Sequence, residues 1–380
     1  MTKDRLTVRR LMQIAASLVS LLLTCTVWSA PPPGVLDETH AGVRAVMAVQ
    51  GEVTSDLMKL EGILGTAVGL DDNDQLALVV YVDRDSAKMA DLVRGLPPQI
   101  RGTGIKVELT DKFRAMGPGK PGGGVSHTAK QTPPIQLGTS GGWGGPLTYK
   151  APYYYCCGGT LGSLIQVNGE QYILSNFHVF EGDIENGSNG TTAKTGDSIV
   201  QPGLIDLNCD VLKAQAVGKL VKLSSLPDNN VDCSVAQVIP DMVKADGSIL
   251  EIGTISSQTV GASLKQAVQK SGRTTGLASS TVSGINGTIS VAYDNECAGV
   301  QAFVKTFTKQ IIVANRGSKF LAAGDSGSLM VEKVSPNPRA VGLLYAGSSV
   351  DAIANPISEV LAFIGPAVGG TGAVATMVGK

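Results

Sequence analysis

The sequence has little of several features that specialised proteins depend on. Aromatic residues make up 4% of the 380 residues, histidine occurs three times, and the formal net charge is −1. Without a field of basic side chains, no nucleic-acid partner is expected. No CxxC or His/Cys spacing predicts zinc, so we expect no metal and no cofactor. Glycine is abundant, with 47 residues, and many glycines beside few aromatics favour a turn-rich β-protein over a helical bundle.

Residues 1–30 have the pattern of an export signal. Four basic residues and one acid accompany a nearly continuous apolar run from Leu11 to Leu23, and Ala30 precedes three prolines. The run is short for a membrane span. We therefore expect a secreted or periplasmic protein, with an uncleaved N-terminal anchor as the alternative. Beyond this segment, 27 basic and 31 acidic residues remain.

An exported protein can form disulfide bonds. One of the six cysteines, Cys25, lies within the predicted signal, and five follow it: Cys156, Cys157, Cys209, Cys233 and Cys297. Because five is odd, at least one cysteine is unpaired or pairs between chains. Cys209–Cys233 is one candidate bridge among several.

Residues 31–116 predict a small α/β domain. Apolar residues recur at helical spacing over 35–60, and two apolar stretches at 63–70 and 76–82 flank a polar turn, as in a β-hairpin. A short helix at 86–96 and a strand at 105–109 complete an α-β-β-α-β order. No catalytic constellation occurs in it, and His40 is interpreted as a surface residue. The domain is either a pro-region that assists folding or blocks a cleft through an intramolecular contact, or a partner-binding domain.

Residues 117–146 are rich in proline and glycine, which predicts a linker without core or regular structure. His127 lies there and is set aside as a catalytic candidate. From 147 to 380 the pattern becomes short strands between turns. Asn168-Gly169 and Asn286-Gly287 each separate two apolar stretches, so both predict β-hairpins. This half of the chain is predicted to be a β-barrel or sandwich.

The run Gly324-Asp325-Ser326-Gly327-Ser328 predicts a tight turn that exposes a serine hydroxyl. Glycines permit conformations that other residues avoid, and backbone N–H groups around such a turn can bind an oxyanion. An ordinary surface turn is the alternative interpretation. A serine nucleophile needs an adjacent base, and with the other two histidines set aside, His178 at the end of an apolar strand is the candidate.

An imidazole base in turn needs a carboxylate that fixes its tautomer. Asp232 enters the apolar alternation of Val231, Cys233 and Val235, which is unusual for a surface acid. Its rivals, all in polar loops, are Asp206, Asp210 and Asp228. The alternative is that Asp232 is a turn acid at the start of a strand.

These segments resemble those of trypsin-like serine proteases. The Gly-Asp-Ser-Gly loop resembles their nucleophile loop, Ser175 to Val179 resembles their Thr-x-x-His-Val histidine loop, and the order His178, Asp232, Ser326 is the chymotrypsin order. Ser271 to Leu277 is similar to the Ser-Gly-Arg-Thr-Thr-Gly segment of alpha-lytic protease and the streptogrisins, although their flanking disulfide is absent here. Residues 342–347 and 354–357 resemble the plant narrow-leaf protein and its bacterial relatives. The resemblance covers about 147–365.

The resemblance implies a mainly β, chymotrypsin-like double β-barrel that hydrolyses peptide bonds in proteins or peptides. Ser326 would be the nucleophile, His178 the base and Asp232 its orienting acid, with the N–H groups of Gly324 and Ser326 as oxyanion hole. It further implies an ion pair between Arg273 and Asp325. The implied substrate pocket is lined by Phe320, Ala323, Tyr345 and Gly347, with no acid at its base.

Two other functions remain open at this point. One is a binding protein on a protease scaffold, which a degenerate triad would favour. The other is a quality-control protease of the HtrA type, for which the 54 residues after Ser326 leave no room for a PDZ domain. The natural substrate, the cleavage preference and the oligomeric state are not predicted by the sequence.

Overall fold

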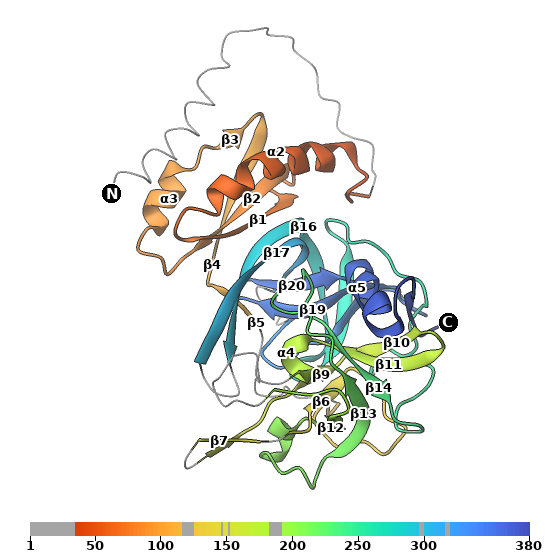
Figure 1. The fold of residues 1–380 in the computed structure, drawn as a ribbon. Coiled ribbons are helices and arrows are strands. Elements are labelled where there is room, and N and C mark those ends of the chain that lie inside the picture. Colours follow the sequence, from red (N-terminus) through yellow and green to blue (C-terminus); the bar gives the residue numbers. More distant parts are fainter. Residues whose placement is uncertain are drawn as a thin grey trace, which may run out of the picture.

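A computed structural model describes residues 35–115, 125–145, 147–150, 153–181, 192–295, 300–315 and 320–380. Side chains are described for these residues except 148–155 and 294–302. The fold is mainly β, with two large curled sheets and an α/β unit at the N-terminal end (Figure 1). The predicted signal of residues 1–30 lies outside the described residues. Within them, no helix has both the length and the apolar character needed to cross a membrane.

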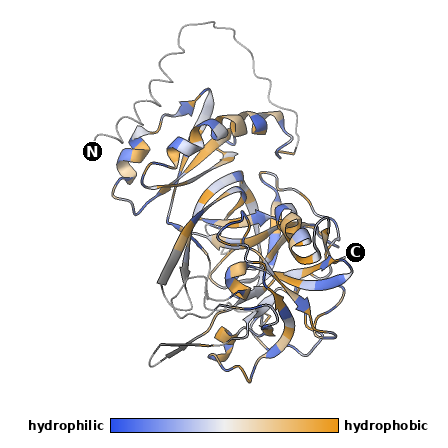
Figure 2. Ribbon diagram, in the orientation of Figure 1, coloured by the Kyte–Doolittle hydropathy of each residue, from blue (hydrophilic) through white to orange (hydrophobic). Residues whose placement is uncertain are grey.

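The N-terminal unit has the order α-β-β-α-β-β-β, with two short strands more than the predicted α-β-β-α-β. Its elements are α2 (Ala41–Leu57), β1 (Ile63–Leu70), β2 (Leu76–Asp83), α3 (Met89–Gly95), β3 (Gln99–Ile100), β4 (Thr103–Thr110) and β5 (Phe113–Ala115). One face of α2 buries valines at helical spacing against β1 and β2. Figure 2 shows apolar residues on the strands beneath this helix and both kinds of residue along the helix itself.

This unit is joined to the rest of the chain through its sheet. Strand β1 pairs with β16 (Gly276–Asn295), so that β1, β2, β4 and β3 extend a sheet whose other strands come from the C-terminal half. Gln50 on α2 and Asn286 on β16 reinforce the junction: Gln50 Nε2 donates to the Asn286 carbonyl and Asn286 Nδ2 donates to Gln50 Oε1, both at 2.9 Å.

The pairing between Gln50 and Asn286 also explains a wrong prediction. Asn286-Gly287 is not a hairpin turn; it lies within the continuous strand β16, where the register against β17 (Val300–Ala314) shifts on both sides of Gly287. Asn286 still adopts the left-handed backbone, with φ of 52°. By contrast, Asn168-Gly169 forms the predicted two-residue turn between β10 and β11.

The first curled sheet has eight strands in the order β21-β10-β11-β14-β13-β12-β6-β9. Their bounds are β6 (Thr139–Trp143), β9 (Gly159–Leu161), β10 (Ser163–Val167), β11 (Glu170–Ser175), β12 (Ser198–Gln201), β13 (Gln215–Val221), β14 (Ser234–Val238) and β21 (Ala375–Met377). Strands β7 (Thr148–Lys150) and β8 (Tyr153–Tyr155) pair separately. The short helices beside this sheet are α4 (Phe177–Phe180) and η1 (Leu204–Leu207).

The predicted linker at 117–146 is wrong for its second half. Strand β6 lies within it, and Ile135 and Leu137 are fully buried in the core of the first sheet. His127 is also buried: Nδ1 lies 2.8 Å from the Gly138 carbonyl and Nε2 lies 2.6 Å from a carboxylate oxygen of Glu251. Apolar residues between the prolines and glycines provide enough buried surface to order this stretch.

The second curled sheet closes on itself. Successive pairings join β15, β18, β19, β20, β17 and β16, and β16 pairs again with β15. Their bounds are β15 (Ala267–Gly272), β16 (Gly276–Asn295), β17 (Val300–Ala314), β18 (Leu329–Glu332), β19 (Ala340–Gly347) and β20 (Asp351–Pro356), and α5 (Ile357–Gly369) follows. The nucleophile-like loop lies between β17 and β18.

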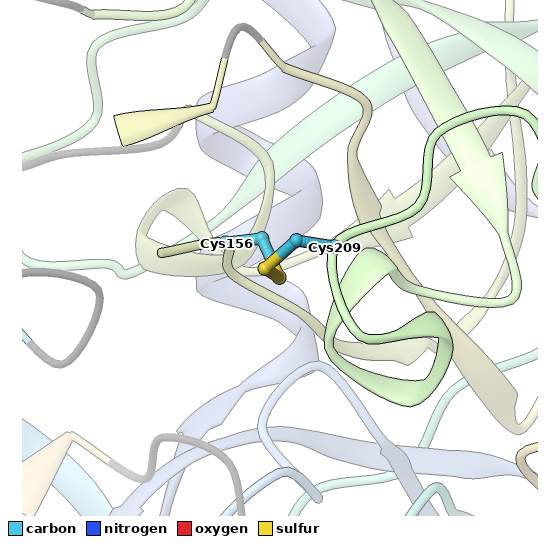
Figure 3. The surroundings of a disulfide bond; sticks show 2 residues. All are labelled: Cys156 and Cys209. Carbon is cyan, nitrogen blue, oxygen red and sulfur yellow. A yellow bond between two sulfur atoms is a disulfide. The ribbon is translucent and has the colours of Figure 1, made fainter. Parts of the chain in front are cut away.

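A disulfide bond links Cys156 and Cys209, which are 53 residues apart in sequence (Figure 3). The candidate bridge between Cys209 and Cys233 is therefore wrong. Cys233 is a buried free thiol whose pKa is raised well above its usual value, first by burial and then by the charge of Asp232. The Cys233 side chain packs in the core of the first sheet.

Candidate functional site

His178 and Asp232 lie in contact. His178 belongs to the single turn of helix α4 that follows β11, and its Nδ1 lies 2.7 Å from Asp232 Oδ2. The His178 side chain is 10% exposed and the Asp232 side chain is fully buried. A buried carboxylate on Nδ1 fixes the imidazole tautomer and leaves Nε2 as the nitrogen that can accept a proton.

The surroundings of Asp232 compensate for the burial of its charge. Its Oδ1 accepts the Phe177 N–H at 2.8 Å, and its Oδ2 also accepts the Tyr293 hydroxyl at 2.8 Å. The backbone is fixed as well, because its N–H donates to Asn355 Oδ1 and its carbonyl accepts Asn176 Nδ2. Hydrogen bonds to the ionised form stabilise a buried carboxylate that would otherwise be costly.

Ser326 lies on a tight turn between two glycines with left-handed backbone, Gly324 at φ of 96° and Gly327 at φ of 91°. A Cβ on Gly327 would lie 2.2 Å from Ser175 Oγ and 2.3 Å from the Thr160 carbonyl, so only glycine fits there. Ser326 is buried, and its Oγ donates to the Tyr345 carbonyl at 3.2 Å.

The turn and the histidine helix are packed close to each other. Gly159 lies between them, since a Cβ on it would be 2.7 Å from a Val179 methyl and 3.0 Å from the Ser326 carbonyl. The Nε2 atom of His178 is buried and has no hydrogen-bond partner among the described residues. The structure thus joins His178 to Asp232 and brings the loop of Ser326 to their side, while the Ser326 hydroxyl is directed at Tyr345.

The two predicted oxyanion donors have a defined orientation. The Ala323 carbonyl accepts the Thr274 hydroxyl at 2.7 Å, and the Asp325 carbonyl accepts the N–H and hydroxyl of Ser328. In a trans peptide the N–H points opposite to the carbonyl of the same unit. The N–H groups of Gly324 and Ser326 therefore point away from Thr274 and Ser328, respectively.

The predicted ion pair between Arg273 and Asp325 is wrong. Asp325 pairs with Lys270, whose Nζ lies 3.1 Å from Oδ1, and both side chains are fully buried. The direction of side chains along β15 explains this, because Lys270 and Gly272 share a face. A Cβ on Gly272 would lie 2.7 Å from Asp325 Oδ1. Burial lowers the pKa of Lys270, and the neighbouring Asp325 charge partly opposes this shift.

Arg273 instead holds Asp206, one of the rivals considered for the triad acid. Its Nε and Nη2 donate to the two carboxylate oxygens at 2.8 and 2.6 Å, in a nearly buried two-pronged pair. The guanidinium also lies against the serine turn, since a Cβ on Gly324 would be 2.6 Å from its Nη1. Arg273 thus supports the turn by packing rather than by pairing with Asp325.

Thr160 is a structural residue of the site that sequence reasoning missed. Its N–H donates to the Ser326 carbonyl at 2.9 Å, and its hydroxyl donates to the Gly324 carbonyl at 3.0 Å. The same hydroxyl accepts the Arg273 N–H, and its carbonyl accepts the Ser175 hydroxyl. A threonine at the start of β9 gives no local signal, because its partners lie far away in sequence.

Three of the four predicted pocket residues are buried in this structure. Phe320 and Tyr345 are fully buried, Gly347 is buried, and Ala323 is partly exposed. The edge of β19 in this region is occupied by β5, with Ala115 opposite Ala346 and Arg114 opposite Gly347. The substrate pocket itself stays a prediction.

Comparison with known proteins gives a fold-level likeness. No family model matches the sequence, and no curated protein matches it. Its structural neighbours are bacterial serine proteases of the chymotrypsin fold, at low identity. A glutamic acid-specific serine protease has 18% identity and a TM-score of 0.38, over 64% of this chain and all of that chain. Protease A of Thermobifida fusca has 16% identity and a TM-score of 0.37, over 63% of this chain and 98% of that chain.

Chymotrypsin of Cellulomonas bogoriensis has 17% identity and a TM-score of 0.37, over 65% of this chain and 99% of that chain. At such identities and scores the activity has to be argued from this chain's own residues.

Proposed function

We propose that this protein is an exported serine endopeptidase in which His178, Asp232 and Ser326 form the catalytic triad. The observation that carries the proposal is the His178–Asp232 contact, in which a fully buried carboxylate with three side-chain hydrogen bonds accepts from Nδ1 of the histidine. Burying a carboxylate is costly, so its placement on Nδ1 of a histidine supports a functional role, and the serine turn lies next to the same histidine helix.

In the proposed mechanism, Ser326 Oγ attacks the carbonyl carbon of the scissile peptide bond and its proton passes to His178 Nε2. Asp232 stabilises the imidazolium through Nδ1. The protonated His178 then transfers the proton to the leaving amine, which yields an acyl-enzyme on Ser326. Water, deprotonated by His178, attacks the ester and releases the acid. Ser326 recovers its proton from His178.

The negative charge of the tetrahedral intermediate would be stabilised by the N–H groups of Gly324 and Ser326. Both carbonyls that precede these amides are engaged by Thr274 and Ser328, which supports a preformed orientation. The Asp325 side chain holds the turn in place. Its carboxylate accepts the N–H groups of Ala322, Thr274 and Thr275. It also pairs with Lys270.

We further propose that the N-terminal unit is a pro-region that blocks the cleft. Strand β5 lies between β19 and β16 and occupies the β19 edge at Ala346 and Gly347, where an extended substrate would add as a strand. The buried ring of Phe113 anchors this strand against Tyr81, with ring centroids 5.6 Å apart.

One observation favours the alternative, a binding protein on a protease scaffold. His178 Nε2 has no hydrogen-bond partner among the described residues, so the base and nucleophile are not joined in this state. Catalytic hydrogen bonds in free enzymes are often formed only with substrate bound. An active protease whose cleft is blocked by its own N-terminal unit would also lack a hydrogen bond between the base and the nucleophile. We therefore favour the protease. Export is supported by the Cys156–Cys209 bridge.

The test is turnover of a casein-type substrate after removal of the N-terminal unit by limited proteolysis. Ser326→Ala and His178→Ala should each lower turnover by at least about a thousandfold, with unchanged thermal unfolding. Residual turnover within tenfold of wild type in either variant would refute the triad. Wild type that is folded and inactive after removal of the unit would favour the binding protein.

A further inference from the structure

Tyr293 places a buried hydroxyl on the acid of the proposed triad. It lies near the end of β16, its side chain is fully buried, and its hydroxyl donates to Asp232 Oδ2 at 2.8 Å. The same oxygen is 2.7 Å from His178 Nδ1. Two donors thus share one carboxylate oxygen, and the strength of one bond affects the other.

The hydroxyl remains a donor over a wide pH range. Burial raises the pKa of Tyr293 well above its usual value, and the negative charge of Asp232 raises it further. Other titratable groups near the couple are Tyr345 and Cys233, whose pKa values are also raised, first by burial and then by Asp232. Glu181, at the end of α4, has its pKa raised by burial and accepts the Ser234 hydroxyl.

The aromatic ring of Tyr293 restrains the imidazole. It meets the His178 ring edge to face, with centroids 6.0 Å apart and an interplanar angle of 69°. On β17, Phe303 is the register partner of Tyr293 and stacks on it at 4.8 Å and 13°. Because the Tyr293 ring is held by Phe303, its contact with the imidazole restricts rotation of the His178 side chain.

We propose that Tyr293 is a positioning residue for the His178–Asp232 couple, with its hydroxyl dispersing the charge of Asp232 and its ring fixing the imidazole plane. This inference rests on the proposed protease function. The Tyr293 hydroxyl is then the third group that holds Asp232, beside the Phe177 N–H and the Asn355 amide. No pattern in the sequence predicts this contact.

Removal of the hydroxyl has a defined electrostatic consequence. In Tyr293→Phe, Asp232 Oδ2 accepts only from His178, so its charge is less dispersed and it stabilises the imidazolium more strongly. The NMR titration of the His178 ring should therefore move to higher pH. The reaction of Ser326 should nevertheless slow by roughly tenfold, because an Asp232 carboxylate that has lost one of its hydrogen bonds holds the imidazole less firmly in the reactive orientation.

The experiment uses the full-length protein with ¹⁵N-labelled histidine, and His178→Ala assigns the signal among the three histidines. Tyr172→Phe is the matched control, since it removes a hydroxyl from another buried tyrosine, on β11. The reactivity of Ser326 is measured as the rate at which a fluorophosphonate probe phosphonylates its hydroxyl, with loss of fluoride. A version with 3-fluorotyrosine at position 293, whose hydroxyl is a stronger donor, should shift the His178 titration to lower pH.

The proposal is supported if Tyr293→Phe moves the His178 titration upward and slows labelling while Tyr172→Phe changes neither. It is overturned if Tyr293→Phe titrates and labels as wild type does, or, should that variant not fold, if fluorotyrosine leaves the titration unchanged. If wild type does not label even after limited proteolysis of the N-terminal unit, but the titration of the full-length protein shifts as expected, the protease function fails and the positioning of the couple stands.

Discussion

Lys270 and Asp325 form an ion pair in which neither side chain has any exposure, with Nζ 3.1 Å from Oδ1. The ammonium also donates to the Thr275 hydroxyl and, at 3.2 Å, to the Gly276 carbonyl. Asp325 directly precedes the proposed nucleophile and accepts three backbone N–H groups of the surrounding loops. This pair therefore connects β15 to the turn on which the proposed chemistry depends.

We predict that Lys270→Met lowers the free energy of unfolding by about 3 to 5 kcal/mol, because it leaves a buried carboxylate without its cation. Turnover should fall further than binding of a peptide inhibitor, since the turn carries the oxyanion donors. Lys333→Met removes an exposed lysine and is the control. Chemical denaturation measures the stability; a Lys270→Met protein as stable as Lys333→Met would contradict the account.

The same pair gives a pH prediction. Burial lowers the pKa of Lys270 from the usual 10.5, so this lysine loses its proton below that pH and Asp325 loses its charged partner. Turnover should fall on the alkaline side below pH 10.5, and Lys270→Arg should move this fall to higher pH. An alkaline limb at the same pH in both proteins would exclude Lys270 as its origin.

The free energy of unfolding should respond to pH in the direction opposite to turnover. Between the lowered pKa and 10.5 the unfolded chain binds more protons at this position than the folded chain does. The contribution of Lys270 to the free energy of unfolding therefore rises with pH in that interval. Measuring both quantities on one protein separates loss of the active turn from unfolding.

Thr160 should be essential for the shape of the serine turn. In Thr160→Val the Gly324 carbonyl and the Arg273 N–H lose a buried partner of nearly unchanged volume. We expect a loss of about 2 to 4 kcal/mol in unfolding free energy and at least tenfold slower acylation of Ser326. Thr254→Val, which removes a partly exposed hydroxyl, should leave both unchanged. Equal acylation rates in the two variants would be evidence against this role.

Blocking of the cleft by β5 is testable in the full chain. Phe113→Ala removes the buried ring that anchors β5, so the strand should leave the β19 edge more often and probe labelling of Ser326 should become faster by about tenfold or more. Leu109→Ala, at a residue 39% exposed on β4, is the control. If Phe113→Ala labels no faster than Leu109→Ala, then β5 does not limit access.

The local motifs of the site could be predicted from sequence, whereas their long-range partners could not. Ser326 and His178 stand in short patterns with distinctive neighbours, so their loops could be located. The partner of Asp325 depends on which face of β15 meets the serine turn: Lys270 lies on that strand, and Arg273 follows its last residue, Gly272. A shift of one position reverses the face of a strand residue, and the sequence does not contain that information locally.

Asn168-Gly169 and Asn286-Gly287 show the same limit. Both dipeptides adopt left-handed backbone at the asparagine, with φ of 51° and 52°, and both lie between apolar stretches. Only the first is a hairpin turn. The second is held inside one strand by Gln50, which is 236 residues away in the sequence, and by pairing with β1. Local turn propensity is thus overridden by tertiary contacts.

Asn355 illustrates a residue whose local pattern suggested the wrong task. An asparagine followed by proline is a common pattern at the N-terminus of a helix, where the asparagine side chain caps the first turn. Asn355 is the second-last residue of strand β20 instead, and its side chain accepts the Asp232 N–H and donates to Gln310. The helix α5 begins after Pro356 without a side-chain cap. The Asn355 side-chain amide thus fixes the backbone of the buried Asp232 and does not cap the helix.

The central claim is that Ser326 is a nucleophile activated by His178 and Asp232. Mass spectrometry of the fluorophosphonate adduct, after limited proteolysis of the N-terminal unit, tests it most directly. We predict a single adduct mapped to Ser326, absent in Ser326→Ala and formed at least about a thousandfold more slowly in His178→Ala. An adduct on another serine, or one formed equally fast in His178→Ala, would contradict the account.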